Sequence, residues 1–220
     1  MSVDLRLYAL VDPDRSGGHD LGELAREVVR GGATLVQLRD KTGSTRRMLD
    51  LAREIKHALD GTFVPLLIND RVDIALAAGA DGVHIGWDDM PVADARRLLG
   101  REAIIGLSIK TREQVDAAPL ELLDYVCIGG VFETMSKDNR EPPVRPEGFA
   151  ALAKLVRARA PHMPVGAIAG INRDNAAQVI AAGADGVAVI SALSITPDPQ
   201  QAAAQLRGVI DEALDRKGAA

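Results

Sequence analysis

Polar and charged side chains alternate along one short apolar stretch, TLVQLRDK, at residues 34–41. Successive side chains of an extended strand point to opposite faces, so Gln37, Arg39 and Lys41 share one face with Leu35. A guanidinium and an ammonium placed together can bind phosphate oxygens. The spacing therefore indicates an anion-binding strand end, although two solvated surface charges are an equal alternative for this pair taken alone.

Two later apolar stretches also end in polar residues. Asn69 and Asp70 follow PLLI, and Asp88 and Asp89 follow VHIGW. Two carboxylates with an amide form the oxygen-rich set that Mg²⁺ prefers. Two residues in these stretches could instead have a purely structural role. Asp70 taken alone could cap the next helix, and His84 could be a hydrogen-bonded core histidine.

Hydroxyl groups and lysines follow the next two apolar stretches. Ser108 and Lys110 end the first of them, and Thr134, Ser136 and Lys137 follow the second. The last two stretches end instead in AGIN and ISA, whose small residues allow the backbone to approach a ligand closely. Thr111 and Gln114, three residues apart, have the spacing of a helix capping box.

An internal repeat explains how the polar residues that follow these apolar stretches could lie close together in space. AAGADGVHIG at 77–86 and AAGADGVAVI at 181–190 share seven residues, and RGGATLVQL at 30–38 follows the same plan. Each copy indicates a helix end, a glycine turn and an apolar strand. Scanning for this plan predicts eight strands, at 5–11, 34–39, 65–69, 82–86, 104–108, 125–130, 164–169 and 186–190.

Eight strands that alternate with amphipathic stretches of helical period predict a compact α/β (βα)8 TIM barrel, with an open doubly wound sheet as the rival. We expect residues 1–220 to form one domain, because no linker interrupts the pattern. The carboxyl ends of barrel strands carry the chemistry, and the polar residues fall there. The longest stretch without periodicity, 129–146, has the length of a functional loop.

The length, net charge and cysteine count of the chain exclude several classes of function. The chain has 220 residues, a net charge of −5 and an isoelectric point near 5.4. Without a basic run, nucleic acid and anionic membranes are poor partners. A single cysteine excludes an intrachain disulfide, and the N-terminus resembles neither a signal peptide nor a membrane span. We expect a cytoplasmic protein that binds small molecules; a homo-oligomer stays open.

Seven motifs in chain order resemble the thiamine phosphate synthase family. They are QLRDK (37–41), IND (68–70), GWDD (86–89), GLSIKT (106–111), TMSK (134–137), AGI (169–171) and VIS (189–191). The resemblance implies a transferase that joins hydroxymethylpyrimidine diphosphate to thiazole phosphate, releasing pyrophosphate and giving thiamine phosphate. Trp87 departs from the pattern, because the family usually has glutamine there.

The resemblance also implies a role for each matching position. Residues implied to hold the pyrimidine diphosphate are Gln37, Arg39, Lys41, Asn69, Ser108 and Lys137. Of these, Arg39, Lys41, Ser108 and Lys137 would act in catalysis, and Asp70 and Asp89 would ligate Mg²⁺. The thiazole phosphate would contact Thr134 and Ser136 together with the backbone at Gly170, Ile190 and Ser191. Leu38, Asp40 and Met135 lie inside the same motifs and are counted as substrate-binding.

Three rival functions remain at this stage. A thiazole tautomerase of the same barrel group would have lost much of the diphosphate site, which the cations and carboxylates here argue against. A non-catalytic regulator that binds thiamine phosphate would not need metal ligands. A phosphate-binding isomerase or lyase barrel would need an acid–base pair, and no convincing pair is present.

Overall fold

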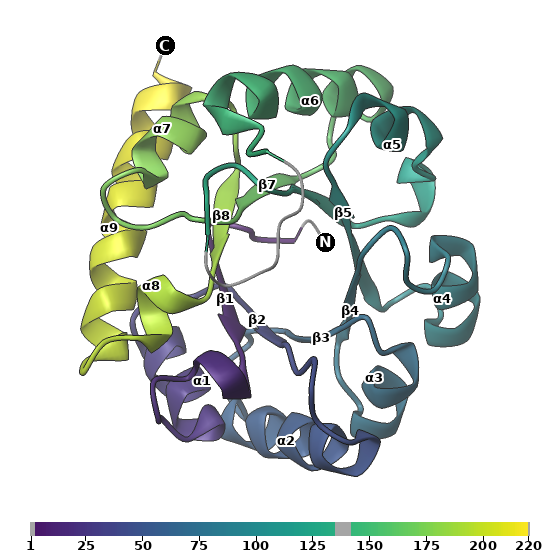
Figure 1. Cartoon of the computed structure of the whole chain (residues 1–220), viewed down its shortest axis with the longest axis vertical. Helices are drawn as coiled ribbons and strands as arrows, with labels where there is room; N and C mark the ends of the chain where they lie inside the picture. The colour runs from purple at the N-terminus through teal and green to yellow at the C-terminus, as the bar shows by residue number, and fades with distance from the viewer. Residues whose placement is uncertain (1–2, 135–141, 220) are drawn as a thin grey trace.

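Eight parallel strands close into a barrel in chain order, β1 to β8, as the sequence predicts (Figure 1). The computed structural model describes residues 3–134 and 142–219. The strands are Leu7–Val11 (β1), Leu35–Leu38 (β2), Leu66–Asn69 (β3), Gly82–Ile85 (β4), Ile104–Ile109 (β5), Tyr125–Ile128 (β6), Val165–Ile168 (β7) and Gly186–Val189 (β8). β8 pairs with β1 through Ala9 and Val189, which closes the sheet and rules out the doubly wound alternative.

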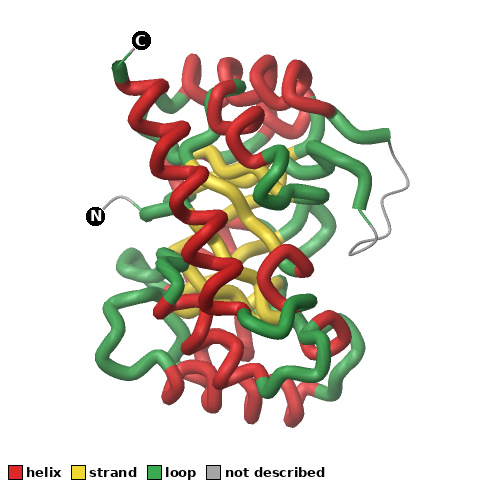
Figure 2. Tube along the Cα trace, turned by 90° about the vertical axis from the view of Figure 1, so that its left-hand side faces the viewer, coloured by secondary structure: helices red, strands yellow, loops and turns green. Residues whose placement is uncertain are grey.

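Helices surround this barrel on its outer side (Figures 1 and 2). They are Leu21–Arg30 (α1), Thr45–Ala58 (α2), Val72–Ala78 (α3), Val92–Leu99 (α4), Arg112–Ala117 (α5), Arg145–Arg159 (α6), Ala176–Ala181 (α7), Ser191–Ser194 (α8) and Pro199–Gly218 (α9), with single 3-10 turns at Pro13–Arg15 (η1) and Leu120–Leu122 (η2). The capping box predicted for Thr111 and Gln114 begins α5. None of the helices in the described part of the chain is long and apolar enough to cross a membrane.

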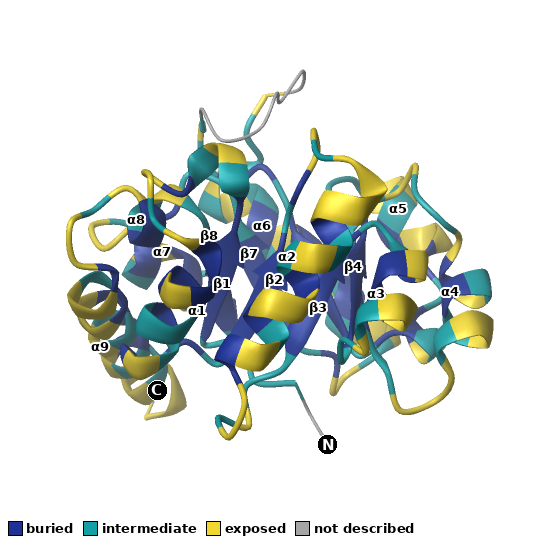
Figure 3. Ribbon diagram, turned by 90° about the horizontal axis from the view of Figure 1, so that it is seen from below, coloured by how far each residue is buried: buried dark blue, intermediate teal, exposed yellow. Residues whose placement is uncertain are grey.

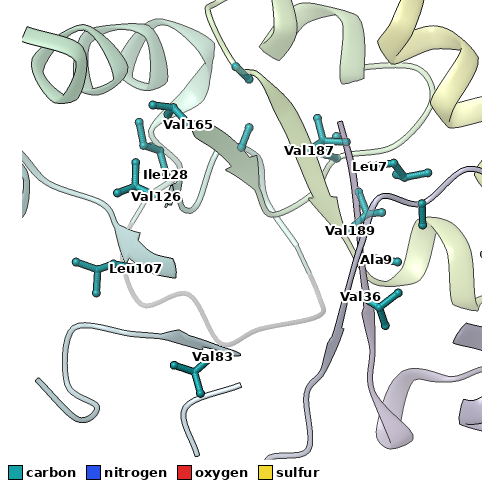
Figure 4. Close-up of a cluster of buried hydrophobic side chains, with 14 of the residues drawn as sticks. Leu7, Ala9, Val36, Val83, Leu107, Val126, Ile128, Val165, Val187 and Val189 are labelled. Atoms are coloured by element: carbon teal, nitrogen blue, oxygen red, sulfur yellow. The ribbon is translucent and has the colours of Figure 1, made fainter. Parts of the chain in front are cut away.

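The alternating strand residues form two separate layers of buried side chains. The strands are drawn mostly in the colour of buried residues (Figure 3). Outward-facing residues such as Val36 and Val187 pack beneath the helices (Figure 4). Inward-facing residues form a smaller cluster inside the barrel. Leu35 lies in this inner cluster and Val36 and Leu38 lie in the outer one, which confirms the expected alternation within β2. Residues 39–41 follow the strand.

Both glycines of the repeated AAGADGV motif occupy positions where the structure disfavours a side chain. Gly79 and Gly183 have φ angles of 65° and 112°, and Gly32 of the related RGGATLV segment has 104°. These left-handed conformations favour glycine because it has no Cβ. The second glycine of the motif lies against a neighbouring strand, since a Cβ on Gly82 would come within 1.9 Å of the Ile104 carbonyl oxygen.

The aspartate of the same motif links a helix to two strands. Asp81 accepts a hydrogen bond from the backbone N–H of Leu66 at 2.8 Å and forms an ion pair with Lys56 at 2.8 Å. Asp185 has the equivalent place before β8 and pairs with Arg157 at 2.8 Å. Both aspartates precede their strands and so stabilise the end of the barrel opposite the predicted site.

Cys127 offers a test of how closely the barrel interior is packed. Its side chain is completely buried in the inner cluster, and burial raises the pKa of the thiol to about 12. Because the thiolate is the reactive species, we expect the native protein to resist alkylation at pH 8. Labelling with iodoacetamide should follow the unfolding transition in denaturant, whereas rapid labelling of the native protein would contradict this packing.

Candidate functional site

A cavity of about 720 Å³ opens at the carboxyl ends of the strands. It brings together predicted site residues that lie far apart in the sequence: Gln37, Arg39, Asn69, Ser108, Thr134, Gly170, Ile190 and Ser191. Further walls come from residues that the sequence analysis did not assign, including Leu10, Arg15 and Gln114. The arrangement follows from the barrel itself, because all parallel strands end on the same face.

Eight predicted site residues are not among the described residues that line the cavity. Three of them, Lys41, Asp70 and Asp89, are described below. Met135, Ser136 and Lys137 lie outside the described residues. The side chain of Leu38 faces the outer layer beneath the helices. Asp40 accepts hydrogen bonds from the backbone N–H groups of the next loop, the shortest of them 2.7 Å long. A substrate contact from Leu38 would therefore have to come from backbone atoms.

Arg39 is held at the cavity wall by a carboxylate. Its guanidinium donates to Asp12, and the two side chains are only 15% and 2% exposed. Asp12 follows β1 and also accepts a hydrogen bond from the backbone N–H of Asp14 at 2.9 Å. A partly buried arginine with one fixed carboxylate keeps its remaining N–H groups available to a ligand. Asp12 is thus a positioning residue that the sequence analysis missed, although it stands at a strand end like the others.

Lys41, Asp70 and Asp89 form a second charged group beside the cavity. The Lys41 ammonium donates to Asp70. Burial, followed by a hydrogen bond with the Asp89 carboxyl, raises the pKa of Asp70, and the Lys41 ammonium opposes this rise. Asp89 also accepts the backbone N–H of Gly86 at 2.7 Å. Two carboxylates held this close are stabilised by any cation that lies between them.

The backbone at Asp70 is itself unusual. Its φ angle is 61°, a left-handed conformation that aspartate tolerates better than most residues. The capping alternative for Asp70 is wrong, because α3 has Arg71 at its N-cap and no side-chain hydrogen bond there. Across the barrel Ala169 has a φ of 88° and lines the cavity. Backbone strain of this kind is concentrated at functional sites in proteins.

A chain of buried hydrogen bonds connects Gln37 to Ser108 through the barrel interior. The Gln37 Nε2 amide donates to the Tyr8 hydroxyl, which lies 2.9 Å from the Tyr125 hydroxyl. Tyr125 lies 2.8 Å from Nδ1 of His84, and Nε2 of His84 lies 2.9 Å from Oγ of Ser108. His84 is therefore a hydrogen-bonded core histidine, as expected, but its partner is a predicted site residue.

This chain is fixed by packing as well as by hydrogen bonds. The rings of His84 and Tyr125 stack with centroids 5.5 Å apart. Tyr125 needs the absence of a side chain on Gly106, where a Cβ would lie 2.0 Å from its ring. Burial raises the pKa of Tyr8 and of Tyr125 well above the usual value, so both hydroxyls stay protonated. The sequence analysis did not identify either tyrosine, because aromatic residues in apolar strands carry no signal of a polar network.

Two buried polar atoms on the cavity wall have no partner among the described residues. They are Oε1 of Gln37, an acceptor, and Nδ2 of Asn69, a donor. An unsatisfied buried polar atom is costly unless a ligand or water completes it. The wall therefore offers a ligand one hydrogen-bond acceptor and one hydrogen-bond donor.

The described residues also fit a magnesium ion. No group of three or more His, Cys, Asp or Glu side chains is found in 3–134 or 142–219 that could enclose a metal ion. Mg²⁺, however, is commonly held by one or two carboxylates together with waters and substrate phosphates. The adjacent carboxylates of Asp70 and Asp89 supply such an incomplete, hard-oxygen donor set, which a phosphorylated ligand would complete.

A TIM barrel whose strand ends carry cations and paired carboxylates has the groups expected of a phosphate-handling barrel enzyme. A family model described as thiamine monophosphate synthase matches residues 7–193. The thiamine-phosphate synthase of Agrobacterium fabrum is 55% identical over 212 residues, which cover 96% of each chain. That of Roseiflexus sp. is 43% identical over 97% of this chain and 89% of its own.

A solved structure supports the same relationship. The thiamine phosphate pyrophosphorylase of Pyrococcus furiosus superposes with a TM-score of 0.83 at 34% identity, covering 96% of this chain and 98% of its own. The chain therefore belongs to the thiamine monophosphate synthase family, which confirms the resemblance seen in its motifs.

Proposed function

We propose that the cavity joins hydroxymethylpyrimidine diphosphate to thiazole phosphate, giving thiamine phosphate and pyrophosphate. By family the protein is a thiamine-phosphate synthase, a transferase of thiamine biosynthesis. In this reaction the thiazole nitrogen forms a bond to the pyrimidine methylene carbon, and the bond from that carbon to the diphosphate oxygen breaks. One observation supports this assignment most strongly. Arg39 and Asn69 both line the cavity, and Lys41 and Asp70, which follow them closely in the chain, form an ion pair.

The cations at the ends of β2 would stabilise the leaving group. Negative charge grows on the diphosphate oxygens as the carbon–oxygen bond breaks, and Arg39 and Lys41 would stabilise this charge most strongly in the transition state. Lys137 has the same proposed role. The electron-rich aminopyrimidine spreads the positive charge of the carbon, so the reaction needs no protein nucleophile.

The unpartnered atoms of Gln37 and Asn69 support a place for the aminopyrimidine ring. The ring offers an amino donor next to a ring-nitrogen acceptor, which is complementary to Oε1 and Nδ2. Ser108 would contact the same substrate at the other end of the buried chain. Thr134, Ser136 and the backbone at Gly170, Ile190 and Ser191 would then hold the thiazole phosphate, in line for attack.

Asp70 and Asp89 would hold the Mg²⁺ that the family resemblance implies. When bound, the ion supplies a Lewis acid for the diphosphate oxygens. Before binding, Lys41 offsets part of the charge of the two carboxylates. Asp70 would thus pair with the Lys41 ammonium before Mg²⁺ binds and with the ion afterwards. The Asp70 and Asp89 carboxylates would stay ordered both with and without the metal.

Product formation tests the proposal directly. The purified protein is mixed with Mg²⁺, hydroxymethylpyrimidine diphosphate and thiazole phosphate, and thiamine phosphate is followed by mass spectrometry. We expect pyrophosphate in equal amount and no product after addition of EDTA. A change in the thiazole substrate without pyrophosphate release would instead indicate a tautomerase, and binding of thiamine phosphate without turnover would indicate a regulator.

Trp87 is one of the positions at which the chain departs from the family pattern, and its substitution tests whether that departure affects activity. Its side chain lines the cavity but is 43% exposed, which places it at the rim. We expect Trp87→Gln to remain active, because the substitution restores the residue usual at this position and removes no charged group. Steady-state turnover with both substrates is the measurement. Loss of activity would show that the indole contributes a contact that glutamine cannot replace.

Three broader expectations stay predictions. They are a single domain over residues 1–220, a cytoplasmic location and the oligomeric state, for which a homo-oligomer is one of the open alternatives. Limited proteolysis, cell fractionation and the native mass in solution test them in turn.

A further inference from the structure

Arg15 is a cavity residue to which the sequence analysis assigned no role. It is the last residue of η1, directly after β1, and its partly exposed side chain lines the cavity. Ser191 and Ile195 line the same cavity from the segment that follows β8. These segments are neighbours because β1 pairs with β8.

The loop that carries Arg15 is held in place against α8 and the residues that follow it. Gly17, with a φ of 63°, lies so close to α8 that a Cβ there would be 2.5 Å from the Ser194 carbonyl oxygen. The Nε2–H of His19 donates to the Thr196 carbonyl at 2.8 Å. The backbone around Arg15 is therefore fixed before any ligand binds, which reduces the entropy lost on binding.

The charge environment of Arg15 differs from that of the other cavity arginine. The Arg39 guanidinium is paired with the buried Asp12 carboxylate. The Arg15 guanidinium forms no ion pair or hydrogen bond with another described residue. A guanidinium left this way presents its full charge and its fork of N–H groups to a ligand.

The distribution of charge decides which ligand group Arg15 suits. The proposed diphosphate side already has Arg39, Lys41 and the metal-binding carboxylates. Every residue proposed for the thiazole phosphate is neutral, although a phosphate monoester carries nearly two negative charges at neutral pH. We infer that Arg15 binds the phosphate of the thiazole substrate and makes the site select the phosphorylated thiazole, an inference that rests on the proposed function.

Steady-state kinetics with each substrate varied in turn tests the inference. Removal of one hydrogen-bonded charge should raise the KM for thiazole phosphate roughly tenfold to a hundredfold in Arg15→Gln. The KM for the pyrimidine diphosphate should stay near the wild-type value, and Arg15→Lys should recover part of the loss. Arg30→Gln, in the last turn of α1, removes the same charge far from the cavity and serves as the matched control.

The outcomes separate the two proposals. Wild-type protein that makes no thiamine phosphate would overturn the proposed function and this inference with it. Wild-type turnover with an unchanged KM for thiazole phosphate in Arg15→Gln would overturn the inference alone. A rise confined to the KM for the pyrimidine diphosphate would also overturn it, because Arg15 would then serve the diphosphate. Equal melting temperatures of the variants and the wild type confirm that each kinetic difference arises in the site.

Discussion

Arg39→Gln is expected to lower turnover at least about a hundredfold, the usual scale for loss of one preorganised electrostatic group. The same substitution should also lower the melting temperature by roughly 6–20 °C. Loss of Arg39 leaves the Asp12 carboxylate, which is 2% exposed, without its charged partner. An uncompensated buried charge costs about 3–5 kcal/mol, and each kcal/mol corresponds to about 2–4 °C in a chain of this size.

A double variant separates the two effects. Asp12→Asn combined with Arg39→Gln leaves two neutral, hydrogen-bonding side chains in place of the ion pair. We expect it to recover most of the melting temperature, because no buried charge remains, and to stay at least about a hundredfold less active. Recovery of both properties would mean that Arg39 only stabilises the loop after β1. Circular dichroism and the turnover assay, run on the same preparations, give the two readings.

The fold could be predicted from the sequence because local and global signals agree. The glycines of the repeated motif have left-handed backbones or lie against a neighbouring strand, so their positions alone indicate the turns. The strand limits differ by at most two residues, as at the predicted 125–130 and the observed Tyr125–Ile128. There the chain leaves the ladder at Gly129, and Gly130 turns with a φ of 71°.

The site was predictable only in part. Polar residues at strand ends carry a signal, since the barrel brings every such end to one face. Tyr8 and Tyr125 carry none, because their hydroxyls become a polar network only when the closed barrel places them 2.9 Å apart. Asp12 and Arg15 follow the first strand in a short segment that matches no motif. Their roles depend on the contact of Asp12 with Arg39, after β2, and on the packing of the Arg15 loop against the segment after α8. Pairings across the closed barrel are invisible in a single sequence.

Asp70→Asn is expected to lower turnover at least about a hundredfold and to raise the Mg²⁺ concentration needed for half-maximal activity. Asparagine is the sharper substitution than alanine here, because it also tolerates the φ of 61° and so leaves the backbone undisturbed. The amide keeps the shape of the side chain but lacks the charge that would bind the ion.

A matched control lies three residues further along the chain. Asp73 in the first turn of α3 is an exposed carboxylate paired with Arg71, and Asp73→Asn removes the same charge without touching Asp89. We expect this control to keep the wild-type Mg²⁺ dependence. If Asp70→Asn also kept it, Asp70 would serve only as the partner of Lys41, and the ion would have to be held by Asp89 and the diphosphate. A fall in turnover with a shifted Mg²⁺ requirement, in Asp70→Asn alone, would instead locate the metal at Asp70, because both variants remove one carboxylate charge and only Asp70 lies against Asp89.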